Sequence, residues 1–232
     1  YVAIYTDNVN AGNNSATVTV YGIEDYSGLT GTATFTINKA AQTVTFAKDG
    51  EQQTAIYGET FANTATAQLD SAAAKITYSS SDTSIATVDA NGTVTILKAG
   101  DVTIKATAAA TGNVKKGEAT YTLTIGKADP TLAFANSTVS VKTTDTVSNT
   151  LTTVPKDLTV TYTSSDPKVA TVDATTGKVT LVGKGTTTIT ATFKGDEKYN
   201  GAEDTYTLTV DNDAIVYTAE GWYGTYNAQE HS

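Results

Sequence analysis

The chain has 232 residues, of which 39% are hydrophobic and 17% are charged. This provides enough apolar material for folded cores and too little charge for a disordered chain. All 15 basic residues are lysines, and 24 acidic residues outnumber them, giving a formal charge of -9. Nucleic-acid binding needs clustered cations, with arginine favoured for phosphate and guanine contacts, so this composition excludes that class of partner.

Residues 1–38 are interpreted as the closing strands of an incomplete sandwich. Val18 and Val20 lie on one expected strand, and Phe35 lies on the last. Half a sandwich leaves its apolar face and its strand edges uncovered. We therefore expect truncation from a longer array; the alternative is head-to-tail association, in which residues 214–232 add strands to the half-module of a neighbouring chain.

A two-residue alternation of apolar and polar side chains continues through the rest of the chain. Val102, Ile104 and Ala106 alternate with polar neighbours, and the same pattern recurs at 189–193 and 206–210. This period is typical of antiparallel strands with one buried face and threonine on the wet face. The sequence predicts an all-β fold.

A long internal repeat divides the middle of the chain. The segment that begins at Tyr78, YSSSDTSIATVDANGTVTILKAGDVTIKAT, recurs from Tyr162 as YTSSDPKVATVDATTGKVTLVGKGTTTITAT, an offset of 84 residues (162 − 78). Each copy contains a polar turn that ends in Gly92 or Gly177 between two runs of alternating residues, which predicts a hairpin. The spacing corresponds to one immunoglobulin-sized sandwich per repeat.

The repeated pattern Tyr-x-Ser-Ser-Asp-x-x-(Ile/Val)-Ala-Thr-Val-Asp…Gly-x-Val-Thr…Gly…Ile-x-Ala resembles the group 2 bacterial Ig-like domain. Tyr78 and Tyr162 stand where many members of that family carry tryptophan. The resemblance implies tandem immunoglobulin-like β-sandwiches of a secreted or cell-surface bacterial protein, of the kind found in adhesins. It brings no catalytic residues to this chain.

Two matching joints, at 37–40 and 125–128, give the expected domain boundaries. Joints this short imply a semi-rigid rod of sandwiches. We predict a partial Ig-like module at 1–38, complete sandwiches at 39–126 and 127–211, and a tail or the start of a further module at 212–232.

Two features of the last residues are candidate sites. Asp211 and Asp213 supply clustered oxygens of the kind that calcium prefers, although a polar turn that ends a strand explains the same residues. Trp222, Tyr223 and Tyr226 form an aromatic cluster that could stack on sugar rings or anchor a protein, and the alternative is the core of a further module.

The composition argues against catalysis. The chain has no cysteine and a single histidine, His231, so histidine-based triads, thiolate nucleophiles and histidine metal sites are not expected, and we predict that it is not an enzyme. It also lacks an apolar run of the roughly 20 residues that a transmembrane helix needs. The expected function is a structural spacer that displays other domains. The alternative is an adhesion module that binds a glycan or a host surface protein through its end loops or aromatic tail.

Overall fold

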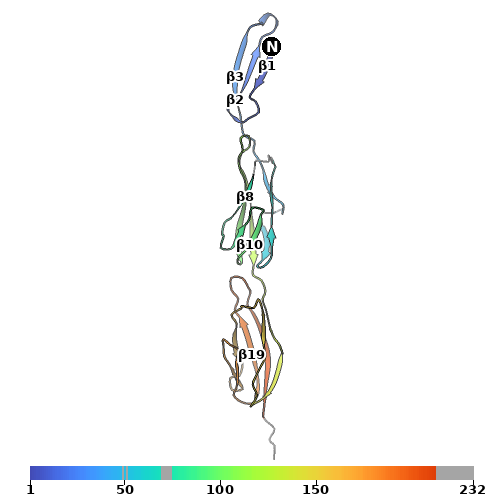
Figure 1. Cartoon of the computed structure of the whole chain (residues 1–232), viewed down its shortest axis with the longest axis vertical. Coiled ribbons are helices and arrows are strands. Elements are labelled where there is room, and N and C mark those ends of the chain that lie inside the picture. The colour runs from blue at the N-terminus through green and yellow to red at the C-terminus, as the bar shows by residue number, and fades with distance from the viewer. Residues whose placement is uncertain (49, 51, 69–74, 213–232) are drawn as a thin grey trace, which may run out of the picture. The chain divides into compact units, whose positions relative to one another are not determined.

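The computed structural model describes residues 1–48, 50, 52–68 and 75–212. These residues form strands joined by turns, and η1 (Glu24–Tyr26), a single 3-10 turn, is the one helical element among them. The all-β prediction is therefore confirmed for the described part of the chain. Figure 1 shows the succession of sheets from the N-terminus onward.

The N-terminal sheet contains β1 (Val2–Thr6), β2 (Gly12–Tyr21) and β3 (Thr30–Ile37), in the antiparallel order β1-β2-β3 (Figure 1, blue). Its register pairs Tyr5 with Val18 and Val18 with Ala33, which places apolar side chains on one face. On that face the rings of Tyr5 and Phe35 meet edge to face, with centroids 6.4 Å apart. Tyr5 is still 57% exposed and Phe35 37% exposed, so the apolar face is only partly covered.

The described residues of the first complete sandwich form nine strands: β4 (Val44–Phe46), β5 (Gln52–Ile56), β6 (Phe61–Ala62), β7 (Ala65–Ala67), β8 (Ile76–Ser80), β9 (Ala86–Val88), β10 (Thr93–Ile96), β11 (Gly100–Ala108) and β12 (Gly117–Gly126). One layer has the strand order β5-β12-β11-β8, with β5 parallel to β12 and the other pairs antiparallel. The opposite layer contains the sheet β6-β10-β9 and the pair β4-β7.

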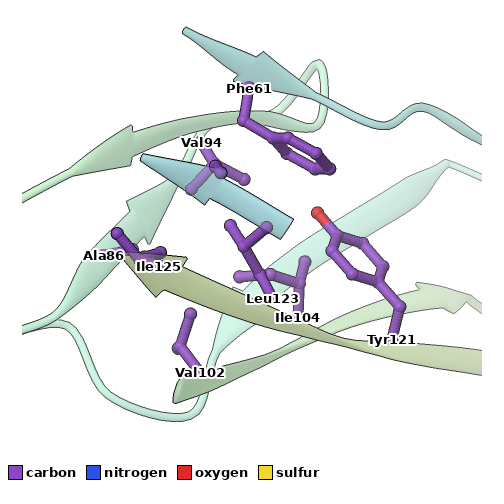
Figure 2. Packing of buried hydrophobic residues seen from close by; sticks show 9 residues of the cluster. Phe61, Ala86, Val94, Val102, Ile104, Tyr121, Leu123 and Ile125 are labelled. Carbon is purple, nitrogen blue, oxygen red and sulfur yellow. The ribbon is translucent and has the colours of Figure 1, made fainter. Parts of the chain in front are cut away.

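The alternation of side chains fills the space between these layers. Ile104 on β11 is opposite Tyr121 on β12, and Val102 is opposite Leu123. All of them are at most 2% exposed. Figure 2 shows Phe61 entering the same core from the other layer, above Tyr121. Burial of such side chains is the main stabilising contribution to the sandwich.

The second complete sandwich repeats this plan with eight strands: β13 (Thr131–Phe134), β14 (Thr138–Lys142), β15 (Leu151–Val154), β16 (Thr161–Ser164), β17 (Ala170–Val172), β18 (Val179–Leu181), β19 (Gly185–Phe193) and β20 (Ala202–Asp211). Its larger sheet has the order β14-β20-β19-β16, again with a parallel pair at one edge. The other layer consists of two separate pairs, β13-β15 and β17-β18.

The predicted hairpin turns are present in both sandwiches. In the first, the Asp89 carboxylate accepts hydrogen bonds of 2.8 Å from the N–H groups of Asn91 and Thr93, and these bonds lower the pKa of Asp89. Gly92 follows with φ of 79°, a conformation that strongly favours glycine. Asp173 caps the corresponding turn of the second sandwich through the N–H of Thr176.

The contacts of the chain group into two compact units. The first contains Tyr1–Asp129 together with Gly195–Asn200, the loop between β19 and β20, and the second contains the rest of the chain. The strands β4 to β12 all fall within the predicted domain 39–126, and β13 to β20 fall within 127–211.

Candidate functional site

The predicted calcium and aromatic residues lie at or beyond the end of the described chain. Asp211 is the last residue of β20, and its backbone carbonyl accepts a hydrogen bond of 3.0 Å from the N–H of Thr143. Asp213, Trp222, Tyr223 and Tyr226 lie outside the described residues. Within the described residues, no group of three or more His, Cys, Asp or Glu side chains could hold a metal ion. The calcium site and the aromatic site stay predictions.

The segment that links the N-terminal sheet to the first sandwich is held by backbone hydrogen bonds. Ala40 forms a β-bridge with Val114, in the loop between β11 and β12. Its N–H donates to the carbonyl of Asn113 at 2.8 Å, and its own carbonyl accepts from the N–H of Lys115 at 2.7 Å. The linking segment is therefore paired as a strand would be, although it belongs to no sheet.

The side chain of Asn113 extends this joint to the N-terminal sheet. Its Oδ1 accepts a hydrogen bond of 2.8 Å from the N–H of Ala11, and its Nδ2 donates to Asn10 Oδ1 at 3.3 Å. On the same loop, the carbonyl of Thr111 accepts a hydrogen bond of 2.9 Å from Lys39 Nζ. Both polar ends of one amide side chain are thus satisfied across the joint.

The loop 195–200 makes a similar set of contacts within the first unit. The N–H of Ala128 donates to the carbonyl of Lys198 at 3.0 Å, and Ala128 forms a β-bridge with Tyr199. The ring of Tyr199 lies edge to face on Tyr57, with centroids 5.3 Å apart. The N–H of Ala99 donates to the carbonyl of Glu197 at 3.0 Å. At each of the two joints predicted from the sequence, a loop therefore forms hydrogen bonds with the linking residue, which is Ala40 at the first joint and Ala128 at the second.

A pocket of about 280 Å³ opens in the second sandwich. Three aromatic rings lie in its wall, those of Phe134, Tyr162 and Tyr206, and the rings of Phe134 and Tyr206 are edge to face with centroids 4.8 Å apart. Asn149 and Gly177 also line the pocket. Burial raises the pKa of Tyr162 and that of Tyr206.

One residue that lines this pocket is smaller than its equivalent in the first sandwich. Asn63 accepts a hydrogen bond from the N–H of Lys48, and Asn149 accepts the matching bond from Asn136, so these two asparagines are equivalent. Two residues before them stand Phe61 and Val147. Phe61 is 6% exposed and packs against Tyr121, whereas Val147 leaves that volume open beside the rings of the second sandwich.

The backbone differs at the same place. In the first sandwich Phe61 belongs to β6, which pairs with β10, and the N–H of Asn63 donates to the carbonyl of Gly92 at 3.0 Å. The second sandwich has no strand at 146–150, and β18 pairs only with β17. A Cβ at Gly92 would lie 2.6 Å from the Asn63 carbonyl oxygen, but the three nearest atoms to one at Gly177 all belong to Tyr162. Gly177 therefore packs against the ring of Tyr162, whereas Gly92 packs against the backbone at Asn63.

The sequence predicted the two joints, but it indicated neither the loop contacts at them nor the pocket. Asn113 and Tyr199 lie in loops whose composition indicated only turns, and Tyr162 was noted only as a substitute for tryptophan. The contrast between Phe61 and Val147 is visible in the sequence, but these residues precede the repeated motif, where the two copies align poorly.

These sheets and joints define a tandem array of immunoglobulin-like β-sandwiches. Residues 34–120 match the bacterial Ig-like domain (group 2), and residues 157–195 match the immunoglobulin-like domain of intimin. These matches confirm the predicted family. No curated protein matches the chain by sequence.

Several solved structures are similar to the chain at low identity. The S-layer protein rSbsC(31-844) is 17% identical with a TM-score of 0.35, and the match covers 94% of this chain and 41% of that one. Three domains of Drosophila N-cadherin are 14% identical with a TM-score of 0.31, and that match covers 85% and 76%. The insect immune protein hemolin is 14% identical with a TM-score of 0.36 and coverage of 73% and 47%.

The described residues include no helix with the length and hydropathy that crossing a membrane requires.

Proposed function

We propose that this chain is a non-catalytic spacer segment of a secreted or cell-surface bacterial protein, whose sandwiches display other domains at a distance from the surface. The family is one of bacterial surface modules, which supports the location. A spacer needs little conserved chemistry on its surface, but its successive modules must resist bending at their joints.

The observation that carries this proposal is the pairing of Asn113 with the N-terminal sheet. The linking residue Ala40 is hydrogen-bonded on both sides, and the Asn113 amide bonds to Asn10 and Ala11. Each hydrogen bond contributes about 0.5–1.5 kcal/mol, so several bonds at one joint favour a single orientation of the linked parts over many alternative orientations. A flexible tether would leave such groups to water.

The distance distribution across this joint tests the proposal. The chain has no cysteine, so spin labels can be placed specifically at Thr32→Cys on β3 and Thr95→Cys on β10, two exposed positions. We expect a narrow distribution of label distances by pulsed electron resonance. Asn113→Ala should broaden it, because the side-chain bonds to Ala11 and Asn10 are lost.

Asn149→Ala is the matched control, since the hydrogen bonds of that side chain go to Asn136 within the second sandwich. It should leave the distances between Thr32→Cys and Thr95→Cys unchanged. A distribution that is already broad before Asn113 is replaced would contradict the spacer function.

The alternative is an adhesion module that binds a glycan or host surface protein through its end loops or through Trp222, Tyr223 and Tyr226. Those three residues lie outside the described chain. Saturable capture of the chain on a glycan or matrix-protein array, lost on Trp222→Ala, would support this alternative. A folded chain that captures nothing would leave the spacer function standing. Light scattering at high concentration would test the predicted head-to-tail association in the same samples.

A further inference from the structure

We infer that the pocket between the layers of the second sandwich is a binding site for a neutral carbohydrate of one sugar ring, free or at the end of a glycan. This site goes beyond the spacer function and does not depend on it. Its walls are Phe134, Val147, Asn149, Tyr162, Gly177 and Tyr206, together with aliphatic and threonine side chains. The size of the pocket, its aromatic rings and its unpaired polar groups all fit such a ligand.

The size of the pocket fits one ring. Its volume of about 280 Å³ lies just below the roughly 300 Å³ at which pockets for drug-sized ligands begin. In the first sandwich, Phe61 and the pairing of β6 with β10 fill the space that adjoins Val147 in the second, while a hollow of about 430 Å³ lies beside Tyr78 and Asn91.

The polar groups at the pocket are of the kind that sugar hydroxyls need. In the first sandwich Tyr78 Oη accepts a hydrogen bond of 2.7 Å from the N–H of Ala65, but the hydroxyl of the equivalent Tyr162 has no hydrogen-bond partner in the described chain. The N–H of Asn149 and the carbonyl of Gly177 are likewise not bonded to each other, unlike their equivalents in the first sandwich. The Tyr162 hydroxyl, the Asn149 N–H and the Gly177 carbonyl belong to residues that line the pocket and have no hydrogen-bond partner in the described chain. Unpaired polar groups at a pocket favour a ligand that satisfies them.

The aromatic rings provide the complementary surface. Phe134, Tyr162 and Tyr206 present ring surface to the pocket, and the apolar C–H faces of a sugar ring pack well on such rings. No residue that lines the pocket carries a charge. A charged ligand would lose its hydration there without gaining a counter-charge, so a neutral sugar is favoured over an acidic one.

Binding of free glucose, galactose, mannose and N-acetylglucosamine to the whole chain, followed by saturation-transfer NMR and by titration of amide shifts, tests the inference. We expect saturable millimolar binding of at least one of these sugars, with shifts at Asn149 and Gly177. Val147→Phe should abolish it, because this change restores the residue that fills the pocket in the first sandwich. No saturable binding of any of these sugars would overturn the inference.

Matched variants in the two sandwiches separate binding from folding. Tyr162→Phe removes the free hydroxyl and should weaken binding about tenfold, the effect of one lost hydrogen bond. Tyr78→Phe makes the same change in the first sandwich and should leave sugar binding unchanged. Binding that survives Val147→Phe in a folded chain, or that responds equally to both tyrosine variants, would overturn the inference. If Val147→Phe fails to fold, the pair of tyrosine variants still decides the question.

Discussion

The hydroxyl of Tyr121 is buried beside the ring of Phe61, whose centroid lies 6.0 Å from that of the tyrosine ring. This hydroxyl has no hydrogen-bond partner in the described chain. Burial raises the pKa of Tyr121 to about 12, because the phenolate form is the one that loses hydration. The core of the first sandwich therefore contains a polar group that contributes nothing to its stability.

Tyr121→Phe should raise the free energy of unfolding by about 1 kcal/mol, since an unpaired buried hydroxyl is replaced by hydrogen. Chemical denaturation of both proteins measures this. Tyr78→Phe is the control: its hydroxyl accepts the N–H of Ala65 at 2.7 Å, so its loss should lower stability by about the same amount. Equal changes in the free energy of unfolding for the two variants would contradict the conclusion that the Tyr121 hydroxyl is unpaired and the Tyr78 hydroxyl is paired.

Alkaline pH should destabilise the chain through these buried tyrosines. The pKa of Tyr121 rises from 10.0 to about 12 on folding, and those of Tyr162 and Tyr206 also rise. A raised folded pKa means that stability is complete below the unfolded value and is lost as pH rises from about 10 to about 12. Thermal melts across this range should show a falling Tm, and Tyr121→Phe should reduce the slope. An unchanged slope would show that other groups are responsible.

Acid should destabilise the chain through carboxylates that accept hydrogen bonds. The ammonium groups of Lys116 and Lys105 hold the pKa of Glu118 at about 2, with N–O distances of 2.6 and 3.1 Å. Hydrogen bonds from the Thr93 and Thr176 backbone lower the pKa of Asp89 and Asp173. With folded values below the unfolded ones, stability is present above about pH 4.5 and is lost as pH falls toward 2.

Asp89→Asn and Asp173→Asn should each flatten this acid dependence in thermal melts. The contribution of Glu118 should shrink in high salt, because that carboxylate is exposed and its ion pairs are screened. If the melting temperature depends on acid pH in the same way for the native and the substituted chains, Asp89 and Asp173 do not cause the acid destabilisation.

Gly92→Ala should destabilise the first sandwich more than Gly58→Ala does. Both glycines have positive φ, 79° and 92°, so each substitution carries about 1–2 kcal/mol of backbone strain. At Gly58 an added Cβ meets nothing within 4 Å, but at Gly92 it lies 2.6 Å from the Asn63 carbonyl oxygen. Denaturation midpoints of the two variants measure the difference. Equal midpoints would mean that the backbone at Asn63 moves aside freely.

Tyr57→Ala should loosen the loop 195–200. The edge-to-face pair of Tyr57 and Tyr199 contributes about 1 kcal/mol, so hydrogen exchange at the Ala99 N–H, which donates to Glu197, should accelerate about fivefold. Exchange measured by NMR tests this. Tyr26→Ala, at a tyrosine that is 69% exposed, serves as the control and should change nothing at Ala99.

Much of the fold could be predicted from the sequence because its signals are local. The alternation through Val102, Ile104 and Ala106 is imposed by the strand itself, which turns successive side chains to opposite faces. The turn at Asp89 and Gly92 is equally local, since the carboxylate bonds to N–H groups two and four residues on. The repeat then required two sandwiches of the same plan, and the matching sheet orders β5-β12-β11-β8 and β14-β20-β19-β16 confirm it.

Other properties depend on residues that are distant in sequence. Asn113 bonds to Ala11 across 102 residues, and a composition of Asn, Gly and Thr indicates only a turn. The pocket depends on Val147 leaving open the volume that Phe61 occupies in the other copy, and on which strands then pair. The sequence by itself determined the strands, the turns and the family, because backbone geometry and side-chain period decide them locally. Only the tertiary structure decided which loops form hydrogen bonds at a joint and where side chains from separate strands leave a pocket. The reason is that packing depends on all the neighbouring residues together.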